Sequence, residues 1–107
     1  MNPYELHCIA GDDLTLAVDF TDGGAALELA EGDRAELILH FPDGAEQVFA
    51  AAAQDGSTAT FLLTGVQTAE LLTQNPTGEF RYCVRLTFAD GSRYTPVYRQ
   101  LLLIAGC

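Results

Sequence analysis

The chain has 107 residues, of which 49% are hydrophobic, and its 15 acidic residues against 5 basic ones give a formal net charge of −10. This length suits one domain, residues 1–107, that buries a core without metal or disulfide support. All five basic residues are arginines, and so acidic a chain lacks the cationic stripe needed to bind nucleic acid or an anionic membrane.

Short segments in which apolar and polar residues alternate follow one another along the chain, and this period of two is typical of half-buried strands. The predicted strands cover residues 4–9, 14–20, 34–41, 47–52, 58–64, 80–88 and 93–104. In the third of these strands, Leu37 and Leu39 share one face, while Ile38 and His40 share the other.

Asp-Gly pairs stand between several of these strands, at Asp22-Gly23, Asp43-Gly44, Asp55-Gly56 and Asp90-Gly91. Asp-Gly favours tight hairpin turns because glycine adopts positive φ angles without steric cost. The pairs therefore predict antiparallel hairpins.

One segment departs from the strand pattern. Residues 66–73 place apolar side chains at helical spacing, and Asn75-Pro76 and Gly78 would end a helix there. The chain has no alternation of strands and helices of the kind that builds a parallel sheet. We therefore expect an all-β fold, an antiparallel two-sheet sandwich of immunoglobulin-like shape, with this one short helix.

Three features of the later strands bear on contacts with other molecules. Pro96 cannot donate a ladder hydrogen bond, which predicts a sheet edge or a bulge at this position. Residues 101–104 are apolar on both faces, so either the fold covers both or one meets a partner. Residues 50–53 are four alanines, which suit a close approach by another surface or a strand end with little to pack.

Charge is unevenly distributed along the sequence. Residues 1–80 hold 14 acidic residues and one arginine, whereas residues 81–107 hold four arginines and one acidic residue. This division is either simple drift in composition or a sign of two oppositely charged faces that guide assembly. On the second interpretation the candidate interaction residues are Arg81, Arg85, Arg93 and Arg99.

No catalytic pattern is present. The only serines, Ser57 and Ser92, directly follow Asp-Gly turns, and no nucleophile elbow, phosphate-binding loop or zinc-protease motif occurs. We therefore expect no catalytic residue, no cofactor and no enzymatic activity.

Two groups of residues contain side chains of the kinds that bind metal ions. His7, Cys8, His40 and Cys83 offer zinc ligands, but neighbours such as His7 and Cys8 point to opposite faces of a strand. Asp12, Asp13 and Asp22 offer calcium ligands near one end of the sandwich, without the spacing of an EF-hand loop. Neither group predicts a metal site.

The cysteines, Cys8, Cys83 and Cys107, are odd in number and form no Cys-x-x-Cys pair, which argues for free thiols in a reducing compartment. The first five residues lack a basic region and no apolar run reaches the length of a membrane span, so we expect no signal peptide and a soluble protein. Immunoglobulin domains place Tyr and Cys two apart, whereas Tyr82 and Cys83 are adjacent and no tryptophan is present.

Several segments together resemble a family of phage proteins. They are residues 10–16 (AGDDLTL), residues 24–29, residues 78–84 (GEFRYCV) and residues 88–91 (FADG). Their layout, over residues 10–104, is similar to the immunoglobulin-like N-terminal domain of phage baseplate upper proteins and related short prophage tail-region proteins. The chain departs from that family in having Phe80 where the first aromatic residue is usually tyrosine. The resemblance implies synthesis in the bacterial cytoplasm, a place in the virion, and no catalytic residues.

From this we expect a non-catalytic structural protein of a phage or prophage tail or baseplate, whose partners are other protein subunits, the chain itself among the candidates. The alternative is a carbohydrate- or ligand-binding sandwich module. Tyr94 and Tyr98, which have the same parity around Pro96, are the aromatic residues on which such a module would depend. A small enzyme would need a cleft that the sequence does not indicate.

Overall fold

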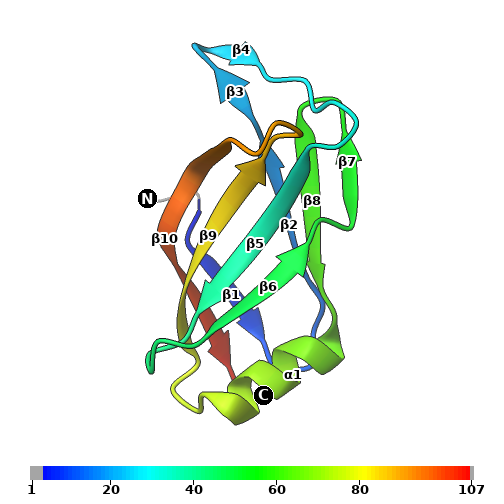
Figure 1. The fold of residues 1–107 in the computed structure, drawn as a ribbon. Coiled ribbons are helices and arrows are strands. Elements are labelled where there is room, and N and C mark those ends of the chain that lie inside the picture. Colours follow the sequence, from blue (N-terminus) through cyan, green and yellow to red (C-terminus); the bar gives the residue numbers. More distant parts are fainter. Residues whose placement is uncertain (1–3, 107) are drawn as a thin grey trace.

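The computed structural model describes residues 4–106, and it shows a mostly β protein with several sheets and one short helix, as the sequence predicts. The larger sheet has the strand order β1 (Leu6–Ile9), β10 (Arg93–Ala105), β9 (Glu79–Thr87), β5 (Arg34–His40) and β6 (Glu46–Ala50). The smaller sheet has the order β2 (Leu14–Asp19), β8 (Thr58–Leu63) and β7 (Ala53–Asp55). A hairpin of β3 (Thr21–Asp22) and β4 (Ala25–Ala26) projects from one end (Figure 1).

The core lies between the two larger sheets, as in a sandwich. Every second residue of β9 is buried in it, and β2 and β8 supply the opposite wall in the same way. The largest fully buried side chains are those of Tyr82, Phe20, Phe61 and Phe80. The Tyr82 hydroxyl donates a hydrogen bond to the backbone carbonyl of Tyr4, which ties the start of the described chain to β9.

One strand pair differs from the expected antiparallel arrangement. β1 runs parallel to the end of β10, with Leu6 opposite Leu102 and Cys8 opposite Ile104. The reason is that β1 and β2 belong to different sheets and are joined by a short turn beside the helix, so β1 must run toward the helix end, as β10 does (Figure 1).

The alanine run is a crossover between the sheets. The strand predicted over residues 47–52 ends at Ala50, because the Ala51 amide donates to Ala35 of the larger sheet (3.2 Å) and the Ala52 amide donates to Thr60 of the smaller one (2.8 Å). The alanine run therefore passes from one sheet to the other within two residues and is not one continuous strand.

The predicted helix is present as α1 (Gly65–Gln74) and closes the end of the sandwich opposite to the β3–β4 hairpin (Figure 1). Thr64 and Gln67 form a reciprocal capping box, which satisfies two amides of the first turn. Asn75 ends the helix, and Gly78 has the positive φ angle that turns the chain into β9. No helix in residues 4–106 is long and apolar enough to cross a membrane.

All four Asp-Gly pairs lie at turns, and each of the four glycines has a positive φ angle. Gly44 and Gly91 close loops of the same design, in which the glycine amide donates to the residue three positions earlier, at 3.0 Å and 2.9 Å. A type I turn followed by a left-handed glycine is a common connection of this length. The turn predictions are therefore confirmed.

The pairing of β10 with β9 is interrupted by two bulges. Tyr94 pairs with Leu86, Val97 with Val84 and Gln100 with Tyr82. In each of the two intervals between these pairs, β10 advances by three residues while β9 advances by two. Pro96 lies in the first interval, which confirms the predicted bulge. Arg99, the one described non-glycine residue with a positive φ angle (49°), lies in the second.

Candidate functional site

All five arginines lie on one surface of the molecule, the outward face of the five-stranded sheet. Arg81 and Arg85 alternate with the buried residues of β9 and therefore point away from the core. Arg34 and Arg93 are both paired with Thr87, which has the same parity as Arg85, so they point outward too. Arg99 reaches the same side from the second bulge. We call this surface, defined by the five arginines, the arginine face.

The guanidinium groups of the arginine face have no partners within the described chain. None of them forms an ion pair or a hydrogen bond with another residue among positions 4–106. Carboxylates are present on the same face: Glu36 is paired with Arg85, and Glu46 with His40, in the register of the sheet. They remain more than 4.0 Å from every guanidinium nitrogen, so the donors of all five arginines are available to another molecule.

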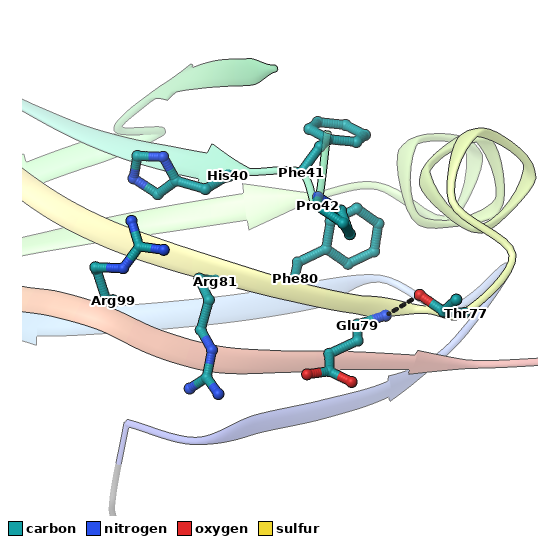
Figure 2. Close-up of a pocket in the computed structure, with 8 residues that line it drawn as sticks. All are labelled: His40, Phe41, Pro42, Thr77, Glu79, Phe80, Arg81 and Arg99. Carbon is teal, nitrogen blue, oxygen red and sulfur yellow. Dashed lines mark hydrogen bonds between the residues drawn. The ribbon is translucent and has the colours of Figure 1, made fainter. Parts of the chain in front are cut away.

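Near the helix end, the arginine face contains a pocket of about 410 Å³. Figure 2 shows its eight lining residues, which come from the end of β5, the turn after it, the turn before β9, the start of β9 and the second bulge of β10. Its walls carry charge from Arg81, Arg99 and Glu79, and a further polar group from His40. Its apolar part is formed by Phe41, Pro42 and Phe80.

Local structure explains why these residues meet. The rings of Phe41 and Phe80 pack edge to face, with centroids 5.2 Å apart and planes at 88°, which anchors the turn after β5 to β9. The Thr77 hydroxyl accepts a hydrogen bond from the Glu79 amide at 3.3 Å (Figure 2). The register of β5 and β9 sets His40 opposite Arg81.

Beside the pocket, Cys83 and His40 are in contact. Cys83 Sγ lies 3.4 Å from His40 Nε2 and accepts a hydrogen bond from the Arg99 amide at 3.3 Å. Cys83 is buried even though it has outward parity, because the bulge brings the backbone of residue 99 against its sulfur. The contact fixes Arg99 and His40 at the same wall of the pocket.

The structure brings only two of the predicted interaction residues, Arg81 and Arg99, into this pocket. Arg85 and Arg93 share the face but lie farther along it. His40 was missed as a site residue, although its place on the strand face opposite Leu37 and Leu39 was correctly predicted. The missing information was which strand would pair with β5.

Tyr94 and Tyr98 do not form one aromatic platform. The prediction that they share a face is wrong, because the first bulge lies between them and reverses the alternation. Tyr94 is paired with core-facing Leu86 and lines a separate pocket with Leu27 at the hairpin end. Tyr98 follows core-facing Val97 and is 66% exposed on the other side.

The residues considered for metals are not brought together. In residues 4–106 no three His, Cys, Asp or Glu side chains are grouped to hold an ion. Cys8 lies two strands away from Cys83, and burial, aided by Asp12, raises the pKa of the Cys8 thiol. Cys107 lies outside the described residues.

The calcium candidates lie at opposite ends of the molecule. Asp13 accepts a hydrogen bond from the Gly65 amide at 2.7 Å, at the start of α1. Asp22 lies in the hairpin at the other end (Figure 1). The expectation that these acids gather near one end of the sandwich is therefore wrong.

Comparison with known proteins does not place the chain in a family: the sequence matches no family model and no curated protein. The chemistry of the arginine face must therefore be interpreted from the residues themselves. Unpaired guanidinium groups beside apolar side chains suit the recognition of carboxylates, which they can bind through two parallel hydrogen bonds.

Proposed function

We propose that this chain is a non-catalytic structural protein that assembles with other protein subunits through its arginine face, as a component of a phage or prophage tail or baseplate. The observation that carries the proposal is the collection of all five arginines, without partners in the described chain, on one face of one sheet. An acidic protein that gathers its whole positive charge on one surface has a surface suited to an acidic partner.

The remaining composition of the arginine face also supports protein contacts. Val48, 53% exposed on β6, and Tyr98 lie on it or beside it. Arginine and tyrosine are enriched in the energetically important parts of protein interfaces, whereas lysine is depleted from interfaces. The face combines the first two, and the chain contains no lysine.

The immunoglobulin-like part of the proposal is supported by strand order. Variable-type immunoglobulin domains have one sheet in which strands G, F, C and C′ are neighbours, and another that contains B, E and D. The neighbours β10, β9, β5 and β6, and the neighbours β2, β8 and β7, follow the same order along the chain. The tail or baseplate assignment rests on the sequence resemblance over residues 10–104.

Mass spectrometry of particles purified after prophage induction in the source strain tests the assignment to a virion. With the major capsid protein as internal standard, we expect this chain at a fixed stoichiometry. Its absence, with the capsid protein detected, would remove the virion role.

A matched pair of variants tests the role of the arginine face. Arg81→Gln/Arg85→Gln and Thr15→Glu/Ala17→Glu make the same change in net charge, on the arginine face and on exposed positions of β2. We expect only the arginine variant to lower incorporation into particles, with both variants still folded by circular dichroism. Equal incorporation of the two would contradict assembly through this face.

A further inference from the structure

We propose that the pocket of the arginine face receives the β3–β4 hairpin of a second copy of this chain, so that copies join head to tail. This assembly rests on the proposed function, because it names the subunit that the arginine face binds. The proposal joins two features that nothing else in the described chain explains: a projecting hairpin and a pocket lined by charged side chains.

The β3–β4 hairpin is exposed and narrow, so it can enter a pocket of another molecule. All its residues, 21–26, are exposed, and its two residue pairs are Thr21 with Ala26 and Asp22 with Ala25. Positive φ angles at both Gly23 and Gly24 make a tight two-residue turn, which keeps the tip narrow. A gap of about 270 Å³ separates this tip from the body of the protein.

The charges of hairpin and pocket are complementary. Asp22 is the acidic residue of the tip, and its carboxylate forms no ion pair or hydrogen bond with residues 4–106. The pocket offers the guanidinium groups of Arg81 and Arg99, against the single carboxylate of Glu79. A carboxylate bound by arginine is held by charge-assisted hydrogen bonds, which are stronger than neutral ones.

The shapes and polarities also agree. Beside the charged groups, the pocket presents the apolar surfaces of Pro42 and of Phe41, whose ring packs against the buried Phe80. The hairpin presents the methyl group of Ala25 on the same face as its partner Asp22. The apolar wall of the pocket thus faces Ala25 while the guanidinium groups face Asp22.

The positions of the two features determine the kind of assembly. The molecule measures 39 × 27 × 24 Å, and the hairpin and the β5–β6 turn beside the pocket lie at opposite ends (Figure 1). A symmetric dimer through the arginine face would set like charges against each other. A head-to-tail contact avoids this, and it leaves one free hairpin and one free pocket, so copies continue into a ring or a filament.

Sedimentation velocity of the purified chain tests the contact. A hairpin in a pocket is a small interface, so we expect weak association that is visible at protein concentrations up to about 1 mM. At ~0.15 M salt the repulsion between two chains of charge −10 is screened beyond roughly 8 Å, while the short contacts persist. We therefore expect association to be stronger at this ionic strength than at ~0.01 M.

Two variants remove opposite sides of the contact. Asp22→Asn removes the hairpin charge, and Arg81→Gln/Arg99→Gln removes the pocket charge; we expect each to weaken self-association at least about tenfold. An equal mixture of the two variants should form heterodimers that do not grow, because one intact hairpin meets one intact pocket. Asp55→Asn, at another Asp-Gly turn, and Thr15→Glu/Ala17→Glu, at exposed positions of β2, match the two test variants in net charge and should associate like wild type.

A wild-type chain that stays monomeric at about 1 mM would overturn the head-to-tail contact. So would controls that weaken association as much as the test variants, or a mixture that behaves like its separate components. Monomeric protein that is nevertheless found in particles would leave the proposed function standing with a different partner. Self-association in a chain that is absent from particles would leave this contact standing and remove the virion role.

Discussion

Replacing Thr68 with valine should destabilise the fold, because a single hydroxyl joins α1 to the turn between β1 and β2. Thr68 is fully buried, and its Oγ1 accepts a hydrogen bond from the Gly11 amide at 3.1 Å. The same hydroxyl donates to the Asp12 carbonyl at 2.9 Å, with the Gly65 carbonyl at 3.1 Å as a second acceptor. Valine keeps the shape of threonine, so the substitution removes these bonds without opening a cavity.

The size of the effect follows from the groups that are left without partners. The Gly11 amide loses its acceptor and the Asp12 carbonyl loses its donor; because both residues are exposed, water can replace part of what is lost, and each hydrogen bond removed costs about 0.5–1.5 kcal/mol. The backbone cannot easily close the gap, because Gly65 already lies so near the Gly11 carbonyl that even a Cβ would overlap it. We expect a loss of about 2 kcal/mol in the free energy of unfolding, and a melting temperature lower by roughly 10 °C in a domain of this size.

Urea denaturation of Thr68→Val, with Thr60→Val as control, measures this difference. Thr60 lies in β8, is half-buried and makes no side-chain hydrogen bond to a described residue, so its replacement should change the free energy of unfolding by less than about 0.5 kcal/mol. Hydrogen exchange of the Gly11 amide should also become faster in the Thr68 variant. If both variants unfold at the same urea concentration, the hydroxyl does not hold α1 in place and the reasoning is refuted.

Three further outcomes are expected. Burial, with a smaller contribution from Tyr4, raises the pKa of the Tyr82 hydroxyl, so the folded state is stabilised below the ordinary pKa of 10.0 and loses this stabilisation as the pH rises above it. Thermal melts above pH 10.0 should therefore show a smaller fall in melting temperature for Tyr82→Phe than for wild type. Gly78→Ala should cost about 1–3 kcal/mol in denaturant unfolding, because a Cβ would overlap a carbonyl of β10 at a positive φ angle, whereas Gly91→Ala shares the positive φ angle but meets no atom and should cost less. The Ser92 hydroxyl, and then its amide, lower the pKa of Asp90, so an NMR titration of Ser92→Ala should show that pKa nearer its ordinary value, and an unchanged pKa would contradict the assignment.

The local elements of this fold were predictable because each depends on neighbouring residues. Period-two alternation marks a strand because successive side chains point to opposite faces, and the buried and exposed positions of β2 and β9 follow that rule. The Asp-Gly turns were predictable because glycine tolerates positive φ angles, and α1 because its spacing and its end signals agree. Even the position of the bulge at Pro96 followed from one missing amide.

The pairing of strands was decided by the tertiary structure. β1 could lie beside β10 in parallel only once β2 had been placed in the other sheet, which the local pattern of residues 4–9 does not encode. The local sequence of the alanine run likewise does not indicate that it changes sheets. The change depends on hydrogen bonds to Ala35 of β5 and Thr60 of β8, which belong to different sheets.

The sequence by itself therefore determined the seven longer strands, the turns, the short helix and the excess of arginine in the last quarter of the chain, but not the short strands β3, β4 and β7. Only the tertiary structure decided which side chains meet. One extra residue in β10, at the first bulge, sent Tyr94 and Tyr98 to different faces, and the register of β5 against β9 set His40 beside Arg81. Local alternation fixes a side chain's face only relative to its own strand, whereas bulges and register, which are set by long-range hydrogen bonds and core packing, fix the surface on which that face lies.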